Sequence, residues 1–138
     1  MTSLIQTFLA SLNDLERAKT LITPDARFIA VRAEQYPDLP LYGTFLGHQG
    51  LEDFVVGLRK AFDTQSFHLD HVIENGEIGA AFGRFEHRIR TTEKVFRSHW
   101  AVMCEFQDGK ISLYRFFEDT AALEDAMGCR THSKESIA

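Results

Sequence analysis

Apolar residues recur with helical spacing in three parts of the chain. Positions 4, 5, 8, 9 and 12 form one stripe, which predicts an amphipathic helix of about three turns. A shorter stripe follows at positions 15, 18, 21 and 22, where Asp14 can cap the helix and Pro24 ends it. The clearest helix carries its stripe at positions 51, 54, 55, 58 and 62, after the glycines at 43, 47 and 50.

The remaining segments favour β-structure. A short strand is predicted at 27–32, ahead of an irregular loop that contains Pro37 and Pro40. Longer strands are predicted at 67–74, 78–90, 95–107 and 110–118. The pairs Asn75-Gly76 and Asp108-Gly109 are typical of tight hairpin turns. A final short helix is predicted from Asp119-Thr120 through Met127.

This order of elements predicts a single α+β domain at residues 1–129 and a polar C-terminal tail at 130–138. Long strands joined by hairpins can curl. We therefore expect a curved antiparallel sheet that forms a cone-shaped half-barrel, with the N-terminal helices packed over it and a pocket between. The alternative is that the inward-facing aromatic residues simply form the core. A chain with 12 phenylalanines can use aromatic surface as core, pocket lining or a dimer face.

Charge and cysteine content narrow the function classes. A net charge of −5 argues against a nucleic-acid partner, and the local group of Arg84, Arg88 and Arg90 is interpreted as a solvated strand face. No N-terminal charged region precedes an apolar run, and no apolar stretch approaches the ~20 residues that span a bilayer. We expect a soluble, cytoplasmic protein without a membrane partner. Cys104 is expected in the core, while Cys129 is a candidate exposed thiol. The histidines and cysteines show no metal-ligand spacing, so neither metal nor cofactor is expected.

Several short motifs occur in an order that resembles a known superfamily. They are YGTFLG at 42–47, GLEDF at 50–54, NGEI at 75–78, Trp100 followed by DGKI at 108–111, and EDT at 118–120. Together they resemble the SnoaL-like, nuclear transport factor 2-like superfamily with its ketosteroid isomerase-like fold, over about residues 4 to 127. The resemblance implies the cone-shaped half-barrel with a hydrophobic pocket. It also implies a homodimer through the convex face of the sheet.

The resemblance does not carry over the catalytic groups of the best-known relatives. The pattern of ketosteroid isomerases puts Phe8, Ala30 and Val102 where those enzymes have a Tyr, a basic Asp and a protonated Asp. The acid of limonene epoxide hydrolases and polyketide cyclases falls at Phe116. None of these four side chains can transfer a proton. Whether the protein is an enzyme is therefore left open.

The polar groups that remain near the expected pocket are few. Tyr114, Phe116 and Glu118 share one face of the last strand, which by resemblance is the concave face. Glu118 is the leading candidate for an acid or base, because aromatic neighbours raise the pKa of a carboxyl group. Its alternative role is an ion pair with an arginine at the pocket mouth. Arg84 or Tyr114 is the candidate that stabilises an oxyanion.

The strand at 78–90 can be placed in two ways. Counting from its start puts four residues inside: Ala80, Phe82, Arg84 and Glu86. Counting back from the next strand puts Phe85 and His87 there instead, and a bulge would exchange the two sets. We favour the first placement.

These observations lead to three hypotheses of function. The first is a pocket protein for a small apolar molecule, with an acid–base lyase, isomerase or hydrolase activity on an unknown substrate. The candidate ligand-binding residues are Trp100, Phe116, Val102, Phe82, Phe8, Glu86 and His87. The second is a non-catalytic ligand-binding or dimerisation module, which the missing catalytic groups favour. The third is an accessory subunit of a larger assembly, with an exposed aromatic face as its contact.

Overall fold

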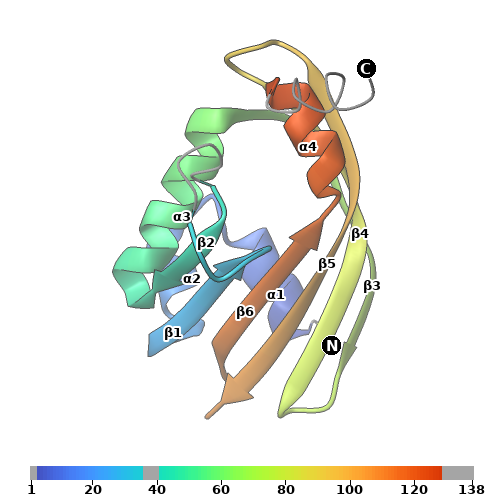
Figure 1. Ribbon diagram of the computed structural model, residues 1–138. Helices are drawn as coiled ribbons and strands as arrows, with labels where there is room; N and C mark the ends of the chain where they lie inside the picture. The colour runs from blue at the N-terminus through green and yellow to red at the C-terminus, as the bar shows by residue number, and fades with distance from the viewer. Residues whose placement is uncertain (1–2, 36–40, 129–138) are drawn as a thin grey trace.

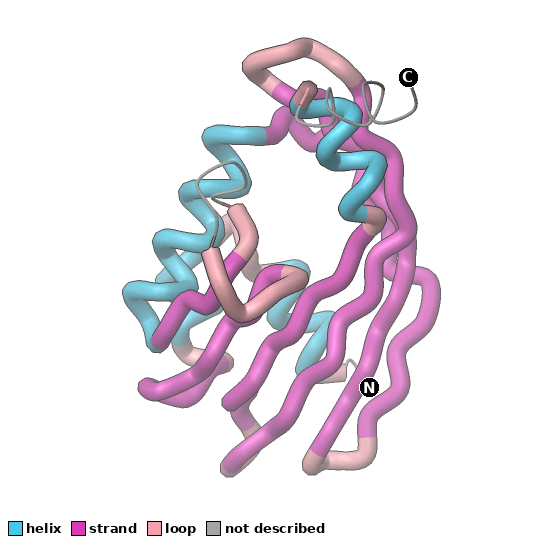
Figure 2. The backbone as a smooth tube through the Cα atoms, viewed as in Figure 1, coloured by secondary structure: helices cyan, strands magenta, loops and turns pink. Residues whose placement is uncertain are grey.

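Six strands form one curved sheet that carries helices on its inner side and at one end (Figure 1). The computed structural model describes residues 3–35 and 41–128. Its elements are α1 (Leu4–Ala10), α2 (Leu15–Lys19), β1 (Ile22–Ala30), β2 (Gly43–Leu46), α3 (Gly47–Ala61), β3 (Phe62–Glu74), β4 (Ile78–Ile89), β5 (Val95–Gln107), β6 (Lys110–Glu118) and α4 (Thr120–Met127). The strand order is β2-β1-β6-β5-β4-β3. Figure 2 shows that the sheet bends strongly but does not close into a barrel. This open, curved sheet confirms the predicted half-barrel.

The best-predicted part is the run of hairpins from β3 to β6. Strands β5 and β6 have the bounds that their alternating pattern predicts. Both turn signals are confirmed: Asn75 Oδ1 accepts hydrogen bonds from the amides of Glu77 and Ile78 at 3.0 Å. Asp108 and Gly109 have φ angles of 53° and 76°, the pair of positive values that a tight hairpin turn needs.

The first half of the chain departs from the predictions at several places. Helix α2 ends at Lys19, because Ile22 already belongs to β1 and pairs with Ile111. Strand β1 is therefore longer than predicted, and it pairs in parallel with β6. The segment expected only as a loop into the third helix contains the short strand β2, antiparallel to β1. Phe62, interpreted as the end of the α3 stripe, is instead the first residue of β3.

The favoured placement of β4 is wrong. Facing residues of an antiparallel pair lie on the same side of a sheet. Gly83 and His87 face the buried Trp100 and Phe96 of β5, so they lie on the inner face. The four residues expected inside lie on the outer face: Ala80, Phe82, Arg84 and Glu86. The count from Ile78 failed because Ile78 is an exposed apolar residue, at 56% exposure.

The bulges that could have exchanged the faces lie in β3 instead of β4. The β3–β4 register shifts between Thr64 and Ser66 and again between Leu69 and His71, while the β4–β5 register runs without a break. Near the second shift, the indole of Trp100 passes Gly83 and donates from Nε1 to the carbonyl oxygen of His68 at 3.1 Å. A Cβ atom at position 83 would collide with that same oxygen. Glycine at this position therefore allows the close approach of β3 to β4.

The core lies between the inner face of the sheet and helices α1 and α3. Phe8 from α1 and Phe54 from α3 both contact Tyr114 of β6, with ring centroids 5.4 and 6.4 Å apart. Phe28 of β1 joins the same cluster, 5.6 Å from Tyr114. These contacts hold both helices over the concave face. In the part of the chain that the structure describes, no helix is both long and apolar enough to cross a membrane.

Candidate functional site

A cavity of about 300 Å³ lies between the inner face of the sheet and the helices α1 and α3. Most of its wall is apolar, with contributions from Leu9, Leu58, Phe62, Phe67, Tyr114 and Phe116. Besides Tyr114, the wall includes five polar side chains: Tyr42, Arg59, Thr64, His87 and Glu118. An aromatic cavity with few polar groups is the common form of a small-molecule site.

Glu118 is the last residue of β6, and its side chain provides the carboxyl group of the cavity wall. Tyr42 is 3% exposed, and its hydroxyl donates to Glu118 Oε2 at 3.1 Å. Burial raises the pKa of Glu118 to about 7, against the opposing effect of this hydrogen bond, and the neighbouring Asp119 adds to the rise. No ion pair among the described residues includes Glu118, so the alternative of an arginine partner is not what the structure shows. Both protonation states of this carboxyl group are populated near neutral pH.

Tyr42 keeps its proton over the physiological range. Its pKa is raised above the ordinary value, first by burial and then by the negative charge of Glu118. A phenol that stays neutral can only donate to a carboxylate or share a proton with a carboxylic acid. Tyr42 therefore orients Glu118 in either state.

His87 is the second titratable group in the wall. Its ring lies between Phe62 and Phe85, with centroid distances of 4.5 and 4.2 Å and interplanar angles of 3° and 26°. Its Nδ1 lies 2.9 Å from the hydroxyl oxygen of Thr64 on β3. Burial lowers the pKa of His87 to about 4, so the ring is neutral at pH 7.

Tyr114 supplies a further polar group. Its ring is buried among Phe8, Phe28 and Phe54, and its hydroxyl makes no hydrogen bond to the residues that the structure describes. Burial raises the pKa of Tyr114, so the phenol stays neutral. A free neutral hydroxyl in a cavity wall can donate to an oxygen of a bound molecule.

The structure brings together only some of the residues that the sequence suggested. Four line the cavity: Glu118, Tyr114, Phe116 and His87. Three lie on the inner side but in the packed core, where they do not line the cavity: Trp100, Val102 and Phe8. Trp100 supports the wall from behind, because its ring stacks on Phe67 at 4.9 Å and on Phe116 at 5.8 Å.

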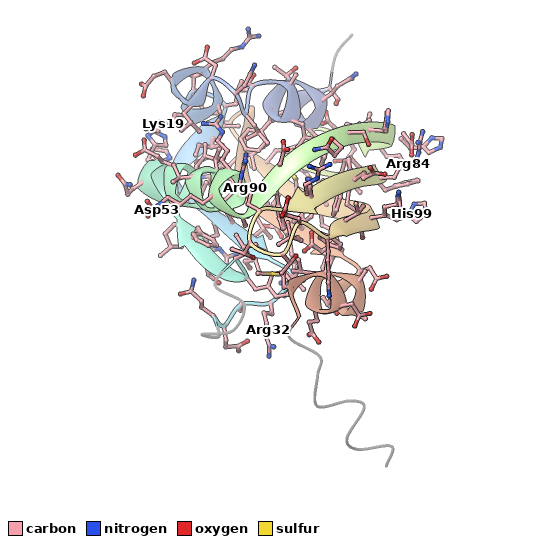
Figure 3. All side chains as sticks on the ribbon, turned by 90° about the horizontal axis from the view of Figure 1, so that it is seen from above. Lys19, Arg32, Asp53, Arg84, Arg90 and His99 are labelled. Carbon is pink, nitrogen blue, oxygen red and sulfur yellow. The ribbon has the colours of Figure 1, made fainter. Side chains whose placement is uncertain are left out.

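The other three candidates lie on the outer face of the sheet. Arg84 pairs with Asp70 through Nε and Oδ2 at 3.2 Å, and Figure 3 shows Arg84 pointing away from the molecule. Glu86 pairs with Arg97 at 2.7 Å. Phe82 is 45% exposed beside His71. Because the strand places them behind the cavity wall, these three residues cannot contact a molecule inside it.

Sequence reasoning missed three polar residues of the wall. Tyr42 is the first residue of the YGTFLG motif at 42–47, but it lies in a non-periodic segment whose side chains have no predictable direction. Thr64 lay between a predicted helix and a predicted strand, so neither period applied to it. Arg59 is an exposed residue in the last turn of α3, outside the apolar stripe of that helix. Its Nη2 donates to the carbonyl oxygen of Leu12 at 2.7 Å. The one usable signal in the sequence was a tyrosine directly before a glycine, at Tyr42-Gly43.

The described residues contain no metal-binding group of three or more His, Cys, Asp or Glu side chains. Cys104 is buried in the core, where burial raises the pKa of its thiol to about 12. A thiol in that state is a poor nucleophile. Cys129, the candidate exposed thiol, lies outside the described residues.

Comparison with known proteins gives a family and a fold. The model of the SnoaL-like domain matches residues 5–114. Patulin synthesis protein F from Aspergillus clavatus is 24% identical over 130 residues, which are 90% of this chain and 66% of that protein. The chain thus spans just under two thirds of the length of that relative.

Solved structures share the fold at low identity. An NTF2-like protein from Burkholderia xenovorans superposes with a TM-score of 0.79 at 21% identity, over 90% of this chain and 92% of that one. TerC co-crystallised with polyporic acid superposes with a TM-score of 0.72 at 22% identity, over 91% and 98%. These neighbours support the cone-shaped half-barrel.

Proposed function

This chain belongs to the SnoaL-like domain family, and we propose that it binds a small, largely apolar molecule and moves a proton on it with Glu118. The observation that carries the proposal is the position of Glu118: a carboxyl group in an aromatic cavity, held by Tyr42 at 3.1 Å and in no ion pair with a described residue. Two similar proteins fit a small-molecule role. One is named for patulin synthesis, and another was crystallised with polyporic acid.

Proton transfer is the chemistry that this arrangement supports best. An ionised Glu118 can take a proton from a carbon beside a carbonyl group and return it to another atom of the same molecule, which needs no co-reactant. Its pKa of about 7 places it near the most effective range for both steps. The free hydroxyl of Tyr114 can donate to the oxygen that gains negative charge. The class of reaction is therefore an isomerase type.

Deuterium exchange tests the proposal without knowledge of the natural substrate. The probe is 2-tetralone in D₂O, and NMR measures deuterium incorporation at the carbons beside its carbonyl group. Glu118→Gln keeps the shape and the acceptor for Tyr42 but removes the base. We expect its exchange rate to fall by about 10²-fold or more.

Glu86→Gln is the matched control, because it makes the same change on the outer face of the sheet. Its exchange rate should equal that of the original protein. Exchange by Glu118→Gln at the original rate would contradict the proposal, since no carboxyl base in the cavity would then be needed.

A non-catalytic binding module is the second candidate. It is favoured by the apolar side chains at Phe8, Ala30, Val102 and Phe116, where the resembling enzymes carry acids and bases. In that case 2-tetralone would change the fluorescence of Trp100, whose ring supports the wall at Phe67 and Phe116, without any exchange above the buffer rate.

A further inference from the structure

The ring of His87 has one polar atom engaged and one free. Nδ1 contacts the Thr64 hydroxyl at 2.9 Å, and Nε2 makes no hydrogen bond to the residues that the structure describes. The side chain is nearly enclosed, at 9% exposure, and it lines the cavity. Nε2 is therefore a hydrogen-bonding atom that a molecule in the cavity can satisfy.

The Thr64 contact determines what Nε2 offers. The hydroxyl of Thr64 either donates to Nδ1 or accepts a proton from it, and the tautomer of His87 decides which. A neutral imidazole whose Nδ1 accepts carries its proton on Nε2. Stacking between Phe62 and Phe85 keeps the ring away from water and holds its orientation. In that tautomer the cavity wall presents one fixed, uncharged N–H donor.

This donor is separate from the pair of Glu118 and Tyr42. Glu118 faces Trp100, Trp100 faces Gly83, and His87 lies four residues beyond Gly83 on β4. On a flat sheet, two strand spacings and four residues correspond to about 16 Å between Cα atoms. Curvature and the inward direction of the side chains shorten that span. A molecule that fills the cavity can therefore contact both places at once.

We propose that His87 donates a hydrogen bond from Nε2 to a carbonyl oxygen, and that the ligands of this cavity are small, uncharged ring ketones. This inference rests on the proposed function and specifies its substrate class. An uncharged donor suits an uncharged oxygen acceptor, because a carboxylate here would be buried without a counter-charge. The ionised form of Glu118 in the same cavity also disfavours an anion. The cation of Arg59 is exposed and already donates to Leu12.

Calorimetry with two matched probes tests the carbonyl preference. 2-Tetralone and tetralin share a ring skeleton and differ by the carbonyl group. The hydrogen bond should make 2-tetralone bind about 3- to 10-fold more tightly than tetralin. His87→Phe keeps an aromatic ring in the stack and should abolish this preference while tetralin binds as before. His99→Phe, on the outer face, should keep the preference.

Two further measurements follow the hydrogen bond itself. The infrared C=O stretch of bound 2-tetralone should lie at a lower frequency in the original protein than in His87→Phe. ¹⁵N NMR of the histidines should show His87 with its proton on Nε2 at pH 7, which needs no variant and so does not depend on the folding of His87→Phe.

The outcomes distinguish a failure of this inference from a failure of the proposed function. Equal affinity for the two probes, a preference that survives His87→Phe, or a proton on Nδ1 overturns the role of His87 while cavity binding stands. If neither probe binds, the cavity function itself fails, and the inference fails with it.

Discussion

Neighbouring residues of β4 belong to two different environments, although they follow one another in the sequence. Phe85 and His87 point inward among aromatic rings, and within residues 3–35 and 41–128 the side chain of His87 has one polar contact, the Thr64 hydroxyl. Arg84 and Glu86 point outward, and each has an oppositely charged partner. On the inner face burial sets the charge state of a titratable group, whereas on the outer face charged side chains pair with one another in contact with water. Unpaired polar groups, which a ligand can use, are therefore expected inside.

The largest contrast between the two faces should come from removing one aromatic ring from each. Phe85 is 4% exposed and packs on Phe96 and Phe67, while Phe82 is 45% exposed. Phe85→Ala should lower the free energy of unfolding by about 3 to 5 kcal/mol, because it leaves a cavity in the core. Phe82→Ala should change it by no more than about 0.5 kcal/mol. Urea denaturation at a low protein concentration measures both, and equal losses would contradict the assignment of the faces.

The same contrast explains why the sequence predicted some of this molecule and not the rest. The hairpin strands were predictable, because local alternation and turn residues such as Asp108-Gly109 determine them. The faces of β4 were not, because an exposed apolar Ile78 at a strand end resembles a buried one. The parallel pairing of β1 with β6 joins distant segments, which no local pattern encodes. Glu118 was found through the face that it shares with Tyr114, whereas Tyr42 depends on a loop whose direction only tertiary packing determines.

A second contrast lies within the cavity, where Glu118 and His87 should respond to pH in opposite directions. Burial raises the pKa of Glu118 to about 7, so the folded protein binds more protons than the unfolded chain from about pH 4.5 to 7. Its contribution to stability is lost as the pH rises through that window. Burial lowers the pKa of His87 to about 4, so its contribution is present above about pH 6.5 and is lost as the pH falls.

Single variants should reveal these opposing slopes. Glu118→Gln has no carboxyl group to ionise in the cavity, so it avoids the stability that the original protein loses as the pH rises. The free energy of unfolding of this variant should therefore rise by about 1 to 3 kcal/mol relative to the original protein between pH 4.5 and 7. His87→Phe should gain a similar amount relative to the original protein as the pH falls from 6.5 to 4. Urea denaturation at a series of pH values checks both. Parallel pH profiles for the original protein and both variants would show that neither group is titrating in an apolar environment.

The outer face has an apolar part as well as its ion pairs, and we propose that a second copy of the chain packs there. Phe82 and Phe117 lie in one row on either side of Ala101, and the exposed Met103 follows on the same face of β5. Met103→Lys should weaken the dimer about tenfold, corresponding to ~1.4 kcal/mol. Gln6→Lys, on the exposed side of α1, should leave association unchanged. Sedimentation that shows only monomer for the original protein at every concentration would remove the proposal.

The smallest effect is expected at Arg84, which sequence reasoning had placed in the pocket. The guanidinium of Arg84 and the carboxylate of Asp70 are 55% and 35% exposed, so water and salt screen their ion pair. Arg84→Ala should cost no more than about 0.5 kcal/mol of unfolding free energy, and added salt should reduce even that difference. The variant should also exchange deuterium into 2-tetralone at the original rate, because its side chain lies on the far side of the strand from the cavity. A loss of exchange comparable with that of Glu118→Gln would mean that the outer face takes part in the chemistry, and the separation of the two faces of β4 would no longer hold.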